Sequence, residues 1–501
     1  MINNNKKILF TQCFDAGASK SDYLYRKPLE YRKHLIEKYP DIKKWVKKEY
    51  FEMEEWPDNI DFIWMNEGVN VPGHFLKDHI DIPSKVIEQP ITIDILLDEL
   101  KKDKYTHVGF SLISNDYTNF IKYAKAVKEF DSSILTIAGG PGALEKDTNR
   151  YVDHVCIGNG VPFLRDLLGE DVNNPYRITI IPDRMIYKFL DKEISSDQCK
   201  IVTRIGCPFK CDFCITNKLF EGYYSGDLFT PTEVHNTLTE YREKIGSNRL
   251  QVFWAEPTSV FHLNWWYELF DLFKEDDGDF SFFVASPSII LNKLDLDRIS
   301  NSAARIGFVN IGIESFNKNY TKNNKIDIKQ LVKKLVDYGI STYATYIIGF
   351  DFDKKETVWK DIKKLMDIDA DMYSVLNLHP LPQTTTWNEL KSKNRLLDLP
   401  PEYFQIHGFQ SFLHPHFKPG FEDMLPLLSK IYKYIETEKG NILINMARTY
   451  ENLMKHTNHP KLIKREMKLY KSIGKALYPA WKDFCKPTKI QEENYLNKIK
   501  I

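Results

Sequence analysis

Strand-like apolar runs alternate with amphipathic helical stretches through most of this 501-residue chain, in two series. The first series begins near residue 91 and ends near residue 169, and the second covers roughly residues 200–390. Such alternation predicts parallel βαβ units, in which ligands bind beyond the carboxyl ends of the strands. The sequence therefore predicts an α/β protein built on parallel sheets.

The two series predict two domains. A Rossmann-like parallel-sheet domain is expected over residues 1–175, with a charged and aromatic elaboration at about 15–90 that contains one further strand, DNIDFIWMN. Residues 176–198 have weak periodicity and are expected to be a linker. Six strand–helix repeats over 199–400 predict a partial (β/α)6 barrel of the TIM type, and residues 401–501 are expected to be mainly helical.

Three cysteines stand close together in RIGCPFKCDFC, in the loop expected after the first barrel strand: Cys207, Cys211 and Cys214. A closed tetrahedral zinc site has four protein ligands, and so has a cubane cluster with a ligand on every iron. Three thiolates are one fewer than either requires. One coordination position is left open, where a small molecule could bind and take up an electron. The other cysteines, Cys13, Cys156, Cys199 and Cys485, are scattered and expected to be buried or incidental, although Cys199 is kept as a possible fourth ligand.

Small residues mark the strand ends of the first series. Ser111 and Ser114 follow one predicted strand, and Gly139 and Gly140 follow the next. Glycine at a strand end lets the backbone approach a ligand closely, but a tight turn explains it equally well.

Charge and hydropathy limit the partners. Lys plus Arg and Asp plus Glu both total 69, so no overall charge attracts nucleic acid or an anionic membrane. No apolar run approaches the roughly 18 residues of a spanning helix, and the first residues do not resemble a secretory signal. We therefore expect a cytoplasmic protein with no transmembrane segment and no nucleic-acid partner.

Taken together, these features resemble the radical S-adenosylmethionine (SAM) enzymes, and more narrowly the subgroup with an N-terminal cobalamin-binding domain. The resemblance covers roughly residues 90–390, and its most specific element is the cysteine motif with Phe213 before the last cysteine. It implies that the three cysteines hold a [4Fe-4S] cluster whose fourth iron binds SAM. An electron from the cluster would cleave SAM to methionine and a 5′-deoxyadenosyl radical, which abstracts hydrogen from the substrate.

Further motifs follow in the order that this family shows. Besides Phe213, the residues implied at SAM are Ala255 and Glu256 from WAEP, Glu314 and Ser315 from NIGIES, and Ile348 and Gly349 from YIIGFD. HPLPQTTTW resembles the sixth-strand motif, with Gln383 in place of the family's glycine. For the acidic residues the alternative is a helix cap or a surface ion pair.

The segments FSLIS, LTIAGGPGAL and VDHVCIGNG resemble the cobalamin domain of the subgroup. The residues they imply at cobalamin are Ser111, Ser114, Gly139, Gly140, Gly158 and Gly160. The subgroup's usual Gly-Glu-Gly-Glu stretch is replaced here by Gly158, Asn159, Gly160 and Val161, and the Asp-x-His-x-x-Gly motif of other cobalamin enzymes is absent. The missing histidine argues against an imidazole lower ligand, and Asn159 leaves open a domain that keeps the fold without the cofactor.

The resemblance favours cobalamin-dependent methyl transfer to an unactivated carbon or phosphorus centre. The expected partners are a small-molecule or lipid-like substrate and an electron donor such as flavodoxin or ferredoxin. Two alternatives stay open: a radical SAM cyclase, epimerase or rearrangement enzyme that uses no cobalamin, and a non-catalytic metal-binding or electron-transfer protein in which Cys199, His235 or His262 adds a ligand. Candidates for proton or radical transfer are His379, Tyr346 and Tyr373, and candidate pocket aromatics are Trp45, Tyr50, Trp56, Trp64, Phe404, Phe409 and Phe412.

Overall fold

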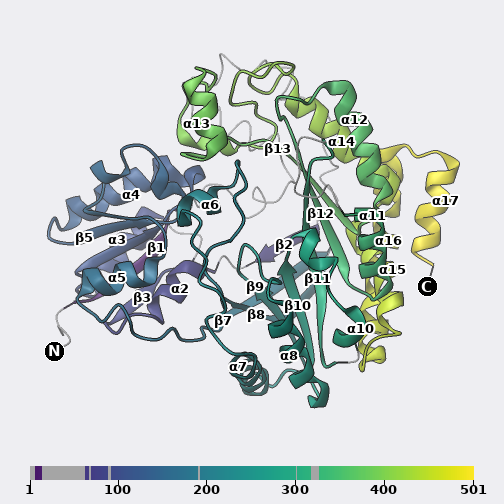
Figure 1. Cartoon of the computed structure of the whole chain (residues 1–501), viewed down its shortest axis with the longest axis horizontal. Helices are drawn as coiled ribbons and strands as arrows, with labels where there is room; N and C mark the ends of the chain where they lie inside the picture. Colours follow the sequence, from purple (N-terminus) through teal and green to yellow (C-terminus); the bar gives the residue numbers. More distant parts are fainter. Residues whose placement is uncertain are drawn as a thin grey trace.

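A computed structural model describes residues 6–13, 62–66, 69–88, 92–189, 192–300, 302–317 and 326–500. Two sheets organise these residues, a five-stranded sheet on the left of Figure 1 and an eight-stranded sheet at its centre. Helices cover both, and the α/β class predicted from the alternation is confirmed.

The five-stranded sheet is entirely parallel. Its order is β3-β1-β4-β5-β6, with β1 Ile8–Gln12, β3 Ser84–Val86, β4 His107–Ser111, β5 Leu135–Gly139 and β6 His154–Cys156. Its helices are α2 Val71–Lys77, α3 Ile93–Lys102, α4 Tyr117–Phe130 and α5 Gly160–Leu168. β3 lies on one side of β1, and the next strands in the chain, β4 to β6, lie on the other side. The strand order therefore reverses between β1 and β4, and open α/β sheets bind ligands at such a switch point. The Rossmann-like domain is therefore confirmed.

The eight-stranded sheet contains the predicted partial barrel. Its order is β13-β12-β11-β10-β9-β8-β7-β2, with β2 Phe62–Asn66, β7 Ile181–Phe189, β8 Lys192–Ile201, β9 Arg249–Trp254, β10 Asp279–Ala285, β11 Ala304–Glu314, β12 Ser341–Ile348 and β13 Met372–Asn377. Strands β8 to β13 run parallel to one another, which confirms the six-strand series.

The linker expected over 176–198 is wrong. Most of that segment forms β7 and the first part of β8, an antiparallel pair whose register runs from Ile181↔Lys200 to Phe189↔Lys192. This pairing satisfies backbone groups that β8 would otherwise expose at the edge of the barrel. Strand β2, expected in the first domain, pairs antiparallel with β7 and so belongs to the second sheet.

Helices pack against one face of this sheet (Figure 1). They include α7 Pro231–Lys244, α8 Leu263–Leu272, α9 Ser288–Leu291, α10 Leu296–Ile299, α11 Ile328–Asp337 and α12 Lys355–Asp367. In β11, Val309, Ile311 and Ile313 are buried in the core on that side, whereas Phe308 and Asn310 alternate with them and are partly exposed. The opposite, concave face is therefore the barrel interior.

The C-terminal region is mainly helical, as expected. Its helices are α14 Met424–Lys439, α15 Ile442–Leu453, α16 Pro460–Cys485 and α17 Lys489–Lys498, all on the right of Figure 1. Two shorter helices stand apart from these. In Figure 1, α6 Ile215–Phe220 lies between the two sheets and α13 Thr385–Ser392 lies above them. No helix of the described chain is long and apolar enough to cross a membrane.

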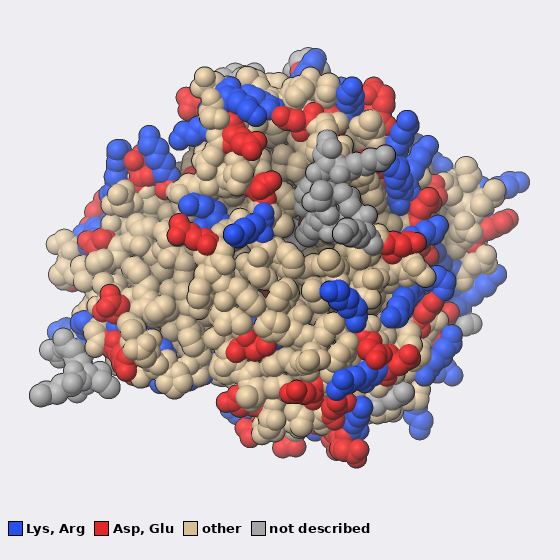
Figure 2. All heavy atoms as spheres, viewed as in Figure 1, with Lys and Arg blue, Asp and Glu red and all other residues tan. Residues whose placement is uncertain are grey.

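Several expected pocket residues have other positions. Trp45, Tyr50 and Trp56 lie outside the described residues, as does the side chain of Trp64. Phe404, Phe409 and Phe412 are at most 4% exposed and form local core. On the face shown in Figure 2, positive and negative side chains are interspersed, in agreement with the equal totals of the two charges.

Candidate functional site

The cysteine loop connects β8 to α6. Cys207, Cys211 and Cys214 are partly exposed, whereas the other four cysteines are buried. Gly206 begins the loop with φ +82° and forms a β-bridge to Tyr224, and a Cβ at this glycine would lie 2.0 Å from the Tyr223 carbonyl oxygen. Only glycine fits this left-handed, crowded position, so the direction in which the chain enters the loop is fixed.

The arrangement of the three thiols is compatible with an iron–sulfur cluster. Among the described residues, no three Cys, His, Asp or Glu side chains converge as one metal ion would require. In an iron–sulfur cubane each thiolate binds its own iron, so the sulfurs need not meet at one point. The soft donor set and its placement in one loop, with Cys207 Sγ 3.4 Å from Thr258 Oγ1, are compatible with such a cluster.

The candidate fourth ligands are engaged elsewhere. Cys199 lies in the helix-side core, and burial raises the pKa of its thiol. His262 Nδ1 lies 2.5 Å from Asp227 Oδ2, and His235 Nε2 lies 3.7 Å from Asp276 Oδ2. The four-ligand alternative gains no support from these positions.

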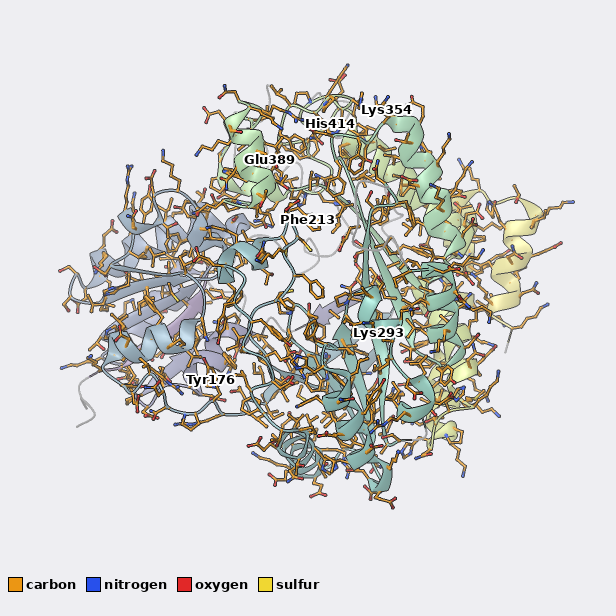
Figure 3. The ribbon with its side chains drawn as sticks, viewed as in Figure 1. Tyr176, Phe213, Lys293, Lys354, Glu389 and His414 are labelled. Atoms are coloured by element: carbon orange, nitrogen blue, oxygen red, sulfur yellow. The ribbon has the colours of Figure 1, made fainter. Side chains whose placement is uncertain are left out.

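Phe213 joins the cysteine loop to the end of β12. It packs with Ile347 and Leu378, and its ring centroid lies 6.1 Å from that of Phe350. Figure 3 shows Phe213 near the centre of the molecule, between α13 and the barrel strands. Gly349, next to Phe350, is therefore close to the loop, and its contact with SAM stays a prediction.

A rigid turn follows β12. Gly349 has φ +100°, and the main-chain N–H groups of Gly349 and Phe350 donate to Asp353 Oδ2 at 2.8 and 3.0 Å. Ile348, fully buried, ends the strand before this turn. The carboxylate thus holds the backbone in a conformation that glycine adopts readily.

Glu256 is buried at the end of β9 and binds the end of β8. Its Oε1 accepts hydrogen bonds from Thr203, through both N–H and Oγ1–H, and from the Arg204 N–H at 2.9 Å. Arg204 Nη1 lies 3.5 Å from Oε2, and both side chains are fully buried. Burial raises the pKa of Glu256 although Arg204 opposes the shift. The carboxylate therefore braces the strand that leads into the cysteine loop, and its contact with SAM stays a prediction.

Ala255 lies at the end of β9, and Glu314 and Ser315 lie at the end of β11, two strands away in the same sheet. Ala255 N–H donates to Ile201 O at 2.9 Å, which brings it beside β8. Glu314 ends β11 with φ +63°, at an irregularity in the β11–β12 register. A left-handed conformation is uncommon for glutamate and is often found at functional sites. Ser315 is buried, and its Oγ accepts from Asn317 N–H at 3.1 Å.

A cavity of about 900 Å³ lies where β5 and β6 end and faces α6. Of the six residues expected at cobalamin, Gly158 lines it and the other five do not. Gly140, with φ +91°, packs on the backbone of Leu112, where a Cβ would lie 2.8 Å from the carbonyl oxygen. The tight-turn explanation therefore holds for Gly140.

The remaining four have ordinary structural surroundings. Ser111 and Gly139 pair with each other across β4 and β5. Ser114 is buried at the start of a 3-10 turn, and Gly160 begins α5 against Leu76.

Asn159, the departure from the subgroup's pattern, has a local role. Its Oδ1 accepts from Val161 N–H at 3.1 Å and caps α5, and its Nδ2 donates to Tyr176 OH at 2.7 Å. Asn159 and Tyr176 both line the cavity.

Two features of this region have no recognisable signal in the sequence. Glu145 lines the cavity and is 9% exposed, and burial raises the pKa of its carboxyl to about 7, with a further increase from Glu402. A second cavity of about 250 Å³ is lined by Cys214 and Thr384, and both cavities share Lys218, Glu221 and Gln383. The cysteine loop and the N-terminal domain therefore border adjoining spaces.

Two of the three candidates for proton or radical transfer face the helices. Tyr346 OH lies 3.1 Å from Asp361 Oδ2 on α12, and Tyr373 is buried in the helix-side core. His379 follows β13; its Nε2 is buried without a hydrogen-bond partner among the described residues, and burial lowers the pKa of its imidazole to about 4.

Comparison with known proteins identifies the central domain. Residues 201–365 match the family model described as the radical SAM superfamily. The chain is 25% identical over 257 residues to the bacteriochlorophyllide d C-12(1)-methyltransferase of Chlorobaculum tepidum, a match that covers 49% of this chain and 52% of the relative. The chain thus spans about half the length of that relative. It is 21% identical over 356 residues to an uncharacterized methyltransferase of Pyrococcus horikoshii, covering 62% and 75% of the two chains.

Two solved structures share the fold over nearly the whole chain. One is the radical SAM methyltransferase TsrM from Kitasatospora setae, with cobalamin and a [4Fe-4S] cluster bound (TM-score 0.58, 11% identity, 93% of this chain and 99% of that one). The other is the cobalamin-dependent SAM radical enzyme OxsB, in its apo form (TM-score 0.54, 10% identity, 99% and 78%).

Proposed function

We propose that this chain, whose residues 201–365 form a radical SAM domain, is a cobalamin-dependent radical SAM methyltransferase acting on an unactivated centre of a small molecule. Cys207, Cys211 and Cys214 would hold a [4Fe-4S] cluster, and SAM would bind at its open iron. An external redox protein would supply the electron. The observation that carries the proposal is the packing of the cysteine loop on the end of β12 through Phe213.

The cluster, SAM and cobalamin supply the electron transfer, the radical and the methyl group when they are bound. The residues of the chain position these groups and keep water away. Phe213, Ile347, Leu378 and Phe350 form an apolar cluster beside the cysteine loop, which limits solvent access. Glu256 and Arg204 brace the strand before the loop from beneath.

The cavity at the ends of β5 and β6 supports a bound corrinoid. It lies at the carboxyl ends of parallel strands, its volume of about 900 Å³ is at the upper end for small-molecule and cofactor sites, and it faces the helix that follows Cys214. The TsrM structure contains cobalamin, and OxsB is a cobalamin-dependent enzyme. The structural similarity to both proteins extends over nearly the whole of this chain.

Anaerobic reconstitution tests the proposal. The purified protein is loaded with iron, sulfide and cobalamin, and its metal, sulfide and corrinoid contents are measured. Turnover with candidate substrates should yield both S-adenosylhomocysteine and 5′-deoxyadenosine. The Cys211→Ala variant should yield neither product. Formation of 5′-deoxyadenosine alone would contradict methyl transfer.

A second candidate is a radical SAM enzyme that uses no cobalamin. Two observations favour it. Asn159, at the cavity wall, caps α5 and donates a hydrogen bond to Tyr176. Of the glycines expected at cobalamin, only Gly158 lines the cavity. Failure to retain cobalamin under conditions that load the cluster would select this candidate.

A further inference from the structure

Four aromatic rings line the concave face of the barrel, one from each of four neighbouring strands: Phe253, Phe283, Phe308 and Tyr343. Phe253 pairs with Phe283 across β9 and β10, and Phe283 pairs with Phe308 across β10 and β11. The ring centroids of Phe283 and Phe308 are 5.6 Å apart, and those of Phe308 and Tyr343 are 6.0 Å apart. We call these four residues the aromatic wall.

The wall faces away from the helices. Val252 and Trp254, on either side of Phe253, are buried in the core beneath the helices, as is Val309 beside Phe308. Side chains alternate along a strand, so the four rings project from the other face. Phe253 is 41% exposed. An exposed ring on the concave face of a barrel indicates a surface that binds something apolar.

An irregularity in β11 brings the rings into line. The β10–β11 register shifts between Phe282 and Phe283, which leaves Gly307 as an extra residue in β11. A Cβ at Gly307 would lie 2.0 Å from Ser281 Oγ and 3.8 Å from the Phe283 ring. Bulges of this kind commonly redirect side chains at binding sites. Without this bulge Phe308 would not pair with Phe283.

The side chain of Asn310 stands beside the wall. Asn310 lies between Ala285 and Tyr343 in register, two residues beyond Phe308 on the same strand face. Its Oδ1 is buried and has no hydrogen-bond partner among the described residues. A buried carbonyl oxygen without a donor is costly, and a ligand N–H would satisfy it. Ala255, expected at SAM, lies two residues beyond Phe253, so the wall is one layer below the expected SAM site.

We propose that the aromatic wall binds a flat aromatic ring system of the substrate, and that a ring N–H of this system donates to Asn310 Oδ1. Offset or edge-on contacts with Phe253, Phe283, Phe308 and Tyr343 favour planar rings over saturated ones. A site with a polar atom of this kind discriminates strongly against an analogue that lacks the donor. The inference rests on the proposed function for the fate of the ligand, whereas binding requires neither cluster nor SAM.

Equilibrium dialysis of the full chain with indole and with 1-methylindole tests the proposal. Indole should bind saturably at millimolar concentrations or below, and 1-methylindole should bind about ten-fold more weakly because it has no ring N–H. Phe253→Leu and Phe308→Leu should each weaken indole binding about five-fold, since leucine keeps the apolar surface but loses the ring. Phe130→Leu is the matched control, because Phe130 on α4 is also 41% exposed. It should change nothing.

Asn310→Leu tests the donor separately. This variant should bind indole and 1-methylindole with equal affinity. If the wild type shows no saturable indole binding, or if Asn310→Leu keeps the preference for indole, the proposal is wrong. Phe253→Leu removes an exposed ring, so its result can be used even if Phe308→Leu does not fold. SAM cleavage is measured in parallel: indole binding without cleavage would count against the proposed function only, and cleavage without indole binding against the wall only.

Discussion

The side-chain amide of Gln383 donates a hydrogen bond to the main-chain oxygen of Leu144, at 2.6 Å, across the boundary between the two domains. Gln383 does so from a left-handed backbone conformation, with φ +61°. This is the position where the radical SAM pattern has glycine, which adopts that conformation without strain. Here a longer side chain takes the place of glycine and connects the barrel to the N-terminal domain.

Replacing Gln383 separates backbone strain from this contact. Gln383→Ala loses the hydrogen bond and keeps the strain, so we expect its free energy of unfolding to fall by about 1 kcal/mol. Gln383→Gly loses the same bond but relieves the strain, which should restore up to about 1 kcal/mol. Chemical denaturation measures both. Equal stability of the two variants would show that the backbone there is unstrained.

The cysteines should divide by burial. Cys207→Ala, Cys211→Ala and Cys214→Ala should each lower iron and sulfide content strongly after reconstitution, because each removes one cluster ligand. Cys199→Ala is the control: Cys199 is fully buried in β8, so its loss should cost about 1 kcal/mol of stability and leave the cluster intact. If Cys199→Ala also loses iron, Cys199 is a ligand of the cluster.

Glu256 should show two separable roles. Glu256→Ala leaves Arg204 buried beside an empty space, and we expect a loss of about 3 kcal/mol in the free energy of unfolding. Glu256→Gln keeps an oxygen that can accept from the Thr203 and Arg204 N–H groups, so it should be closer to the wild type in stability. If Glu256 also contacts the SAM amino group, cluster-loaded Glu256→Gln should bind SAM more weakly. Unchanged SAM affinity would limit Glu256 to bracing β8.

Glu145 should make stability depend on pH. Burial raises the pKa of its carboxyl to about 7 from an ordinary value of 4.5, so the folded protein retains a proton that the unfolded chain releases. The free energy of unfolding should therefore fall as pH rises from about 4.5 to about 7, by about 1 to 3 kcal/mol from this group. Glu145→Gln, which does not titrate, should lose less stability over that range. Parallel pH profiles of the two proteins would contradict this.

Gly307 should be intolerant of a side chain. Gly307→Ala places a Cβ against Ser281 Oγ, and we expect a loss of about 2 kcal/mol and weaker indole binding. The double variant Gly307→Ala, Ser281→Ala removes the closest atom and leaves the Ser281 Cβ at 3.3 Å, so it should recover part of both. Thermal unfolding and dialysis measure the two effects. If the double variant recovers neither stability nor indole binding, the alanine at position 307 clashes with an atom other than Ser281 Oγ.

Regular periodicity was predictable from the sequence, and exceptions to it were not. The alternation of strands and helices indicated the order of β8 to β13 and placed Cys207 after β8. The segment containing Pro182 lacks that alternation, yet β7 forms because it pairs with the exposed edge of β8. Likewise Gly140 matches a ligand-binding pattern but packs on Leu112, a contact that depends on how two loops meet in three dimensions.

The pairing of β2 with β7 has a consequence for how the chain is divided. The chain forms β1 in the first sheet, contributes β2 to the edge of the second sheet, and then returns to the first sheet at β3. The two domains are thus interleaved, and no single cut separates them. A chain that begins at residue 176 would leave the edge of β7 uncovered and prone to association with other chains. During synthesis, more than a hundred residues separate β2 from its partner β7. The strand β2 therefore cannot pair until the hairpin of β7 and β8 has been synthesised.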